Sequence, residues 1–250
     1  MKRLIVNADD FGRTAGINKG ITEAHDQGIV TSATLMVTQP AAQEAAALGK
    51  ARPNLGIGLH LALTGGPSAL PATRIHSLLD ESGRLPAKPE GLTGADPREV
   101  LAEARAQLRR FRELMGRLPT HFDSHHHSHK LPAVLEALVV LSWETGLPVR
   151  SPSPEVRERL RHEGLLTNDE FVDAFFAEGA TLENLVHLIG RIGTGTTELM
   201  CHPAHVDEEL RASSGYVDAR TAELSVLTHL DARATVQACG IQLVNWSAVQ

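Results

Sequence analysis

The sequence predicts an α/β fold, namely a distorted or incomplete (β/α) barrel, similar to a TIM barrel, with about seven parallel strands. Short runs rich in β-branched residues alternate with longer segments of helical periodicity, and there is no repeat motif. Aspartate or histidine stands at the end of several of these runs. Alternating strands and helices imply parallel pairing through right-handed crossovers, and so many units in 250 residues fit a barrel better than an open sheet.

Each predicted strand is a short apolar run bounded by polar, glycine or proline residues. The run at 148–150 is the weakest of them, and residues 151–180 show no clear pattern. In chain order the predicted strands are 3–8 (RLIVNA), 31–38 (TSATLMVT), 55–61 (LGIGLHL), 120–125 (THFDSH), 148–150 (PVR), 197–203 (TELMCHP) and 241–246 (IQLVNW).

Helices are predicted between the strands from periodicity and from residues that start or stop a helix. Ile17, Ile21 and Ala24 recur at helical spacing up to Gly28. The motif DPRE at 96–99 combines an N-cap aspartate with proline at the first helical position. The other predicted helices are an alanine-rich one opened by Pro40, one at 131–145 stopped by Gly146, one at about 182–192, and one or two beyond Asp218.

One stretch interrupts the alternation. Residues 64–94 are rich in glycine and proline and are too long for an ordinary connection. We therefore expect one (β/α) barrel domain over residues 1–250, with a lid insertion at 64–94.

Composition excludes several classes of function. Hydrophobic residues make up 42% of the chain and the formal net charge is −6, so nothing indicates an electrostatic interaction with nucleic acid. Two distant cysteines, Cys201 and Cys239, fit a reducing compartment. Neither a signal peptide nor a transmembrane segment is recognisable. We expect a cytoplasmic protein with a small-molecule substrate, and the sequence leaves a homodimer open.

The histidine-rich run THFDSHHHSHK at 120–130 predicts a site. It places five histidines and one aspartate between His121 and His129. If the run begins as a strand, His121, Asp123 and His125 share one face, whereas Phe122 and Ser124 face the other way. This pattern favours a metal or proton-transfer site over a solvated loop.

Other polar residues fall at the ends of other predicted strands. Asp9 and Asp10 end the first strand, His60 ends the third and His202 ends the sixth, beside Asp123 and His125 on the fourth. In parallel barrels the carboxyl ends of the strands meet at one rim, where functional groups gather. Two imidazoles and a carboxylate would hold a catalytic metal with open positions, and a second carboxylate could accept a proton from water.

Two alternatives remain open at this point. His121, Asp123 and His202 match the ligand pattern of non-haem iron oxygenases, although those sites normally occupy antiparallel folds. Alternatively, the chain could be a catalytically silent module that binds a metal or a sugar, for which loss of the base or of a ligand would be the expected sign.

Four motifs together resemble the YdjC-like carbohydrate deacetylases, a family that includes chitooligosaccharide deacetylase and hopanoid-biosynthesis-associated members. The motifs are NADDFG at 7–12, GIGLHLALT at 56–64, THFDSHHHSH at 120–129 and CHPA at 201–204. The resemblance implies a barrel-like fold and a metal-dependent hydrolase. Its reaction would remove the N-acetyl group from a small amino sugar, either a chitooligosaccharide or an N-acetylglucosaminyl conjugate, by means of metal-activated water.

The resemblance also implies roles for single residues. Asp10, His60 and His125 would be the metal ligands, Asp9 the general base, and Asp123 a group that orients a histidine. The ion would be one divalent cation, with Mg or Zn favoured and Mn, Co or Ni also compatible.

The acid that protonates the leaving amine and the contacts to the sugar are our own predictions. His202 is the candidate acid, with His127 as its alternative. Aromatic residues make up only 4% of the chain, and Phe11 is the only one that we place beside the predicted centre. We therefore expect Phe11 to contact a mono- or disaccharide rather than a long polysaccharide.

Overall fold

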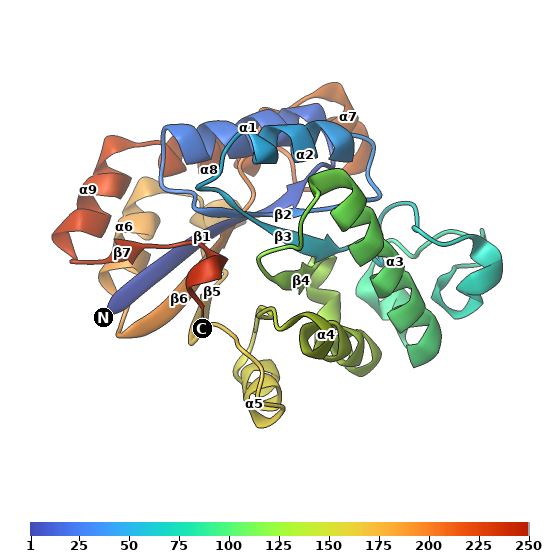
Figure 1. Cartoon of the computed structure of the whole chain (residues 1–250). Helices are drawn as coiled ribbons and strands as arrows, with labels where there is room; N and C mark the ends of the chain where they lie inside the picture. Colours follow the sequence, from blue (N-terminus) through green and yellow to red (C-terminus); the bar gives the residue numbers. More distant parts are fainter. Residues whose placement is uncertain (250) are drawn as a thin grey trace.

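A curled sheet of parallel strands forms the centre of the molecule in the computed structural model, which describes residues 1–249 (Figure 1). The strand order is β4-β3-β2-β1-β6-β5, and β7 pairs with β1. The curled parallel sheet confirms the predicted fold class. The strands are β1 (Lys2–Phe11), β2 (Ser32–Leu35), β3 (Gly56–Leu61), β4 (Phe122–Ser124), β5 (Glu170–Val172), β6 (Gly195–Cys201) and β7 (Gln242–Leu243).

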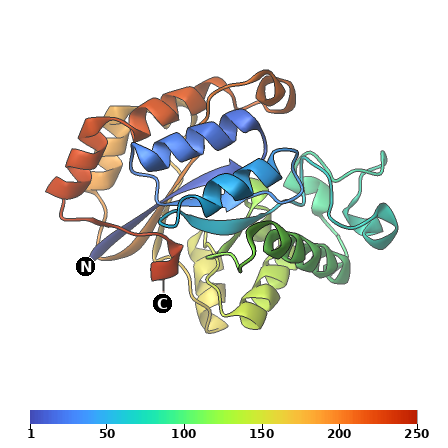
Figure 2. The same ribbon diagram turned by 45° about the horizontal axis from the view of Figure 1, so that its top comes forward.

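Helices cover the outer surface of this sheet (Figures 1 and 2). Several begin and end where the sequence predicts: Asp96 caps α3 by accepting from the Arg98 backbone N–H, and Gly146 ends α4 in the left-handed conformation. The helices are α1 (Ala15–Asp26), α2 (Ala42–Lys50), α3 (Pro97–Met115), α4 (Pro132–Thr145), α5 (Pro154–His162), α6 (Leu182–Gly190), α7 (Glu208–Ser213), α8 (Asp218–Leu227) and α9 (Leu230–Ala238). Within residues 1–249, none is both long and apolar enough to cross a membrane.

β1 is the central strand, and its apolar character follows from its position. It pairs with β6 along most of its length, with β7 at its beginning and with β2 at its end. Every residue from Leu4 to Phe11 is buried as a result. Strands that are covered on both faces in this way are typically continuous apolar runs, so the polar residues at the end of β1 stand out.

The closing side of the sheet differs from the prediction. Residues 148–150 form only an isolated bridge, between Val149 and Phe122, rather than a strand. The fifth strand lies instead at 170–172, within the stretch that showed no pattern. Between the two, the Val149 N–H donates to the Leu166 carbonyl, and the Asn168 side chain hydrogen-bonds the Ser151 backbone on one side and Glu170 on the other. A side-chain amide therefore replaces part of the strand pairing.

The 64–94 segment forms an appendage beside α3 with three short 3₁₀ turns, at Ala72–Arg74, His76–Leu78 and Pro89–Leu92 (Figure 2). The Gly65 N–H donates to the Pro86 carbonyl, which closes its base. The buried carboxylate of Glu103 on α3 accepts from the N–H groups of Ala69 and Leu70 at 2.7 and 2.9 Å. This segment is therefore anchored to the body, and its buried residues Ile75, Leu78, Leu85 and Leu92 belong to the main core.

Candidate metal centre and active site

A cleft of about 700 Å³ opens at the carboxyl ends of the strands. Four strand ends deliver side chains to it, as parallel barrels commonly do. The predicted site residues that line it are Asp9 and Asp10 from β1, His60 from β3, His125 and His127 after β4, and His202 after β6.

Three of these residues direct their ligand atoms at one point. Asp10 Oδ1 lies 3.1 Å from His125 Nδ1 and 3.7 Å from His60 Nε2, and all three side chains are buried. Asp10 Oδ1 accepts no hydrogen bond from any residue in 1–249. Buried polar atoms are normally paired, so this set of one oxygen and two nitrogens fits a divalent cation with open coordination positions. We call Asp10, His60 and His125 the ligand cluster.

A local irregularity separates the two neighbouring aspartates. Asp10 adopts a left-handed backbone conformation, with φ of 70°, and the pairing of β1 with β2 shifts register between Ala8 and Phe11. Successive residues of a regular strand point to opposite faces, whereas this irregularity turns Asp10 toward the histidines and leaves Asp9 pointing into the barrel. The chain also turns directly after His125, because His126 and His127 are left-handed.

His60 is held by polar contacts on its other ring nitrogen. Its Nδ1 lies 2.7 Å from Asp123 Oδ1 and 3.1 Å from Thr34 Oγ1. A carboxylate in this position accepts the Nδ1–H and leaves the lone pair of Nε2 free to face Asp10. Burial opposes protonation of His60, but the charges of Asp123, Asp9 and Asp10 outweigh it and raise the pKa of this histidine.

Beneath the ligand cluster lies a fully buried guanidinium. Arg150 makes two 2.7 Å hydrogen bonds to the carboxylate oxygens of Asp9. It also lies 2.9 Å from Asp123 Oδ2 and 2.7 Å from Glu198 Oε1. We call these four residues the arginine cluster.

The arginine cluster holds its acids in different protonation states. Burial would raise the pKa of Asp9, but Arg150 overcomes this and holds it well below the usual value. Burial raises the pKa of Glu198 to about 7. Arg150 opposes this only in part, because Asp9 and Asp123 share the same guanidinium and repel a charge on Glu198. Sequence reasoning missed Arg150 and Glu198, although a charged residue inside an apolar strand run is a usable signal.

His202 belongs to a third group of side chains. Its backbone N–H donates to Glu223, and its Nδ1 lies 4.0 Å from Glu223 Oε1. Tyr216 donates its hydroxyl to the same carboxylate at 2.5 Å, and the ring of Phe176 stacks on that of Tyr216 with centroids 4.1 Å apart. Burial lowers the pKa of His202 to about 4 and raises that of Glu223 to about 7.

Arg220 joins this third group to the ligand cluster. It is buried, and it donates to Asp10 Oδ2 at 2.5 Å and to the Tyr216 carbonyl at 3.0 Å. Because the guanidinium occupies Oδ2, Oδ1 is the oxygen of Asp10 that stays available. The third group lies in segments without strand periodicity, so sequence reasoning found only His202.

Two expectations need correction. Phe11 is fully buried in the hydrophobic core and does not line the cleft, because it still belongs to the paired part of β1. The aromatic residues at the cleft are Phe176 and Tyr216, so Phe11 is not the only one near the centre.

The oxygenase triad is also wrong. His121 stacks on Trp246 with centroids 4.5 Å apart and is fully buried. Among residues 1–249, no group of converging ligand atoms joins it to Asp123 and His202. Asp123 is instead shared between His60 and Arg150. His127 lines the cleft and packs edge-on against Phe171, with no carboxylate of the described chain at ion-pair distance.

Solved structures resemble the whole chain. A crystal structure of an Enterococcus faecalis protein, named for cellobiose-phosphate cleavage, superposes with a TM-score of 0.93 at 35% identity, covering 100% of this chain and 99% of that one. A family 4 carbohydrate esterase from Streptomyces lividans, in complex with acetate, covers 97% of this chain and 91% of its own with a TM-score of 0.51 at 12% identity. The second likeness concerns the fold alone.

Sequence relatives also cover the chain almost completely. A carbohydrate deacetylase of Geobacillus stearothermophilus is 44% identical over 97% of this chain and 96% of its own length. A chitooligosaccharide deacetylase of Yersinia enterocolitica is 38% identical over 98% of both chains. The YdjC-like protein family matches residues 3–238. The chain therefore belongs to the YdjC-like family.

Proposed function

We propose that the protein is a metal-dependent hydrolase that removes the N-acetyl group from a small amino-sugar substrate, a chitooligosaccharide or an N-acetylglucosaminyl conjugate. The observation that carries this proposal is the convergence of Asp10, His60 and His125 beside a second, separately held carboxylate, Asp9, in one cleft. Relatives named as carbohydrate and chitooligosaccharide deacetylases support the substrate class.

In this proposal Asp10, His60 and His125 hold one divalent cation. A bound cation polarises the acetyl carbonyl and lowers the pKa of water. Mixed imidazole and carboxylate donors are compatible with Zn or Mg, and also with Mn, Co or Ni. Asp123 and Thr34 keep the Nε2 lone pair of His60 directed at the ion.

Asp9 accepts the proton of the attacking water. Arg150 keeps Asp9 ionised and fixes both of its oxygens, so the base is oriented before substrate arrives. Water adds its oxygen to the acetyl carbon, the C–N bond breaks, and the products are acetate and a free amine.

His202 donates the proton that the leaving nitrogen needs. Both His202 and His127 line the cleft, and burial lowers the pKa of both, so either must take up a proton before it can donate one. Only His202 has a carboxyl group of the described chain beside its ring, with Glu223 Oε1 4.0 Å from Nδ1. The same carboxylate is fixed by Tyr216, so His202 is the better placed of the two.

The test is acetate release from N-acetylglucosamine and its β-1,4-linked oligomers by the metal-loaded protein. Chelation should abolish acetate release and leave the far-UV circular dichroism unchanged, because the ligands stand on the strands of a large core. Unfolding on chelation would make the site structural. Sugar binding without acetate release would instead identify a silent binding module.

A further inference from the structure

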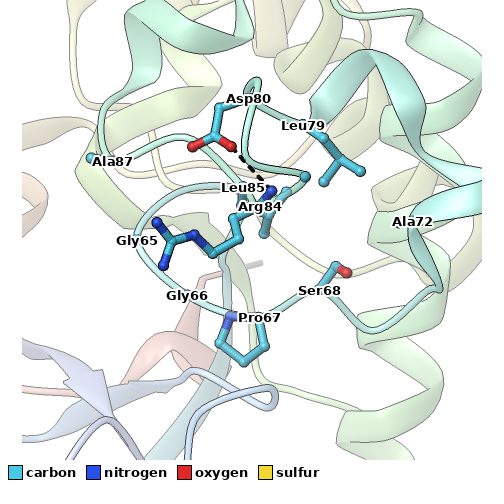
Figure 3. Close-up of a pocket in the computed structure, with 11 residues that line it drawn as sticks. Gly65, Gly66, Pro67, Ser68, Ala72, Leu79, Asp80, Arg84, Leu85 and Ala87 are labelled. Atoms are coloured by element: carbon cyan, nitrogen blue, oxygen red, sulfur yellow. Dashed lines mark hydrogen bonds between the residues drawn. The ribbon is translucent and has the colours of Figure 1, made fainter.

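A second hollow opens within the 64–94 segment, the predicted lid, beside the metal cleft. It measures about 590 Å³, within the range of small-molecule sites, and Figure 3 shows its walls. We call it the lid hollow. It is lined by Gly65, Gly66, Pro67, Ser68, Ala72, Leu79, Asp80, Gly83, Arg84, Leu85 and Ala87.

The lid hollow adjoins the metal cleft. Gly65 and Ala87 line both of them. A methyl group added at Gly65 would lie 3.7 Å from Nε2 of His125, so this end of the hollow is in van der Waals reach of a ligand-cluster histidine. A molecule bound at the ligand cluster therefore needs to pass only Gly65 to reach the lid hollow.

The lid hollow lies on one side of the rim, and the stacked rings of Phe176 and Tyr216, which we call the aromatic pair, lie on the other. The lid follows β3, whereas Phe176 follows β5 and Tyr216 follows β6. In the sheet, β2 and β1 separate β3 from β6. The metal cleft is lined from both sides, by Gly65 and Ala87 and by Phe176 and Tyr216. A substrate across the ligand cluster thus meets the aromatic pair at one end and the lid hollow at the other.

The lining of the lid hollow suits a sugar ring. Pro67, Leu79 and Leu85 supply apolar surface for the C–H faces of a pyranose. In Figure 3 the Arg84 side chain extends between the turn at Asp80 and the turn at Gly65–Pro67. Its Nε donates to Ser82 Oγ at 3.1 Å, while its terminal nitrogens have no partner within residues 1–249 and can donate to hydroxyl or carbonyl oxygens.

The hollow is also held in shape before any ligand binds. Asp80 Oδ1 accepts the N–H groups of Ser82 and Arg84 at 2.8 and 3.1 Å, which fixes the turn that carries Arg84. Glu103 holds Ala69 and Leu70, which lie between the lining residues Ser68 and Ala72. A preformed site loses little conformational entropy on binding.

We propose that the lid hollow is a second sugar subsite, which holds the unit linked to the one that loses its acetyl group. This inference rests on the proposed deacetylase function and deepens it, because it makes a disaccharide or longer oligosaccharide the preferred substrate over the monosaccharide.

The test compares kcat/KM for N-acetylglucosamine with that for its β-1,4-linked dimer. Ala72→Phe fills the hollow and Arg84→Ala removes its free donors. The matched controls are Thr73→Phe and Arg74→Ala, which change the same residue sizes on the exposed turn of Ala72 without lining the hollow. The dimer-to-monomer ratio should fall about tenfold in each lining variant, the equivalent of one or two lost hydrogen bonds or of poor fit, and stay at the wild-type value in both controls.

An unchanged ratio in the lining variants, or an equal fall in the controls, overturns the subsite while leaving the deacetylase function intact. If the wild-type protein releases no acetate from either sugar, the proposed function fails separately, and calorimetric titration with the same two sugars decides the subsite. Tighter binding of the dimer that Ala72→Phe abolishes supports it, and equal affinity for dimer and monomer overturns it.

Discussion

The ligand cluster and the arginine cluster lie side by side in the barrel, yet their charges are balanced differently. In the arginine cluster each of Asp9, Asp123 and Glu198 has an oxygen within 2.7–2.9 Å of an Arg150 nitrogen. In the ligand cluster Asp10 Oδ1 and His125 Nε2 lack partners in residues 1–249. Asp123 Oδ2 and Glu198 Oε2 of the arginine cluster also make no hydrogen bond within the described chain, but both belong to carboxylates that face the Arg150 guanidinium. The unpaired Asp10 Oδ1 instead faces two histidine nitrogens. Burying polar atoms without partners is costly, so the first cluster is suited to holding its members in place and the second to binding a cation.

The largest effect should separate the neighbouring aspartates, one from each cluster. Asp10→Asn removes a charged oxygen ligand and should lower metal occupancy and rate together. Asp9→Asn should keep the metal and lower kcat by about 10²- to 10⁴-fold, the usual contribution of a positioned proton acceptor. Metal content by mass spectrometry and acetate release, measured for both variants, check this.

The opposite pattern would exchange the two roles: metal lost in Asp9→Asn and kept in Asp10→Asn. Full activity in both variants would end the hydrolase mechanism proposed above. Substrate binding serves as the internal control, because it should survive in Asp9→Asn.

The next effect concerns stability rather than rate. Arg150→Met keeps most of the side-chain volume but leaves buried carboxylates without their cation, which should reduce the free energy of unfolding by about 3–5 kcal/mol. The matched control is Arg105→Met, because Arg105 pairs with Glu144 on the surface and should contribute less than about 1 kcal/mol. Urea denaturation of both variants measures the difference. Equal losses would mean that the arginine cluster is no more important to stability than a surface pair.

The pH dependence of stability should be smaller but diagnostic. Glu198 has a pKa of about 7 when folded against 4.5 when unfolded. The folded state therefore binds more protons between these values, so this residue's contribution to stability is complete below pH 4.5 and is lost as pH rises through 7. Glu198→Gln cannot ionise, so raising the pH from 5 to 8 should favour the variant over wild type by up to about 3 kcal/mol at 1.36 kcal/mol per pKa unit.

Urea denaturation across that range measures the effect in both proteins, and the comparison removes the parallel contribution of Glu223, whose pKa is also raised. A difference between variant and wild type that is constant with pH would show that Glu198 stays ionised throughout, and Arg150 would then serve three full charges.

The two clusters also differ in how far sequence alone predicts them. Alternation and helix caps predict the central strands, and strand ends predict Asp10, His60 and His125 as neighbours. The partner of Asp9 lies 141 residues away, and no local pattern encodes such a pairing. Sequence analysis also misses β5, Phe176 and Tyr216, because the segments that carry them have no regular alternation of apolar and polar residues. The identity of the metal, the compartment and the homodimer stay predictions.

The smallest expected effect lies at Thr34, which touches both clusters. Its hydroxyl oxygen is 3.1 Å from His60 Nδ1 and accepts from Asn7 Nδ2 at 3.3 Å, while Asn7 also donates to Asp9. Thr34→Val keeps the shape and removes this oxygen. Asp123 still holds His60, so metal affinity should fall only about tenfold, the lower end for loss of a group that orients a ligand.

Thr120→Val is the matched control, because it removes a 3.0 Å contact to His121, a histidine outside the ligand cluster. Metal titration of the two variants decides the point: equal affinities would show that Asp123 alone orients His60, and a much larger loss at Thr34 would show that the two clusters depend on one another.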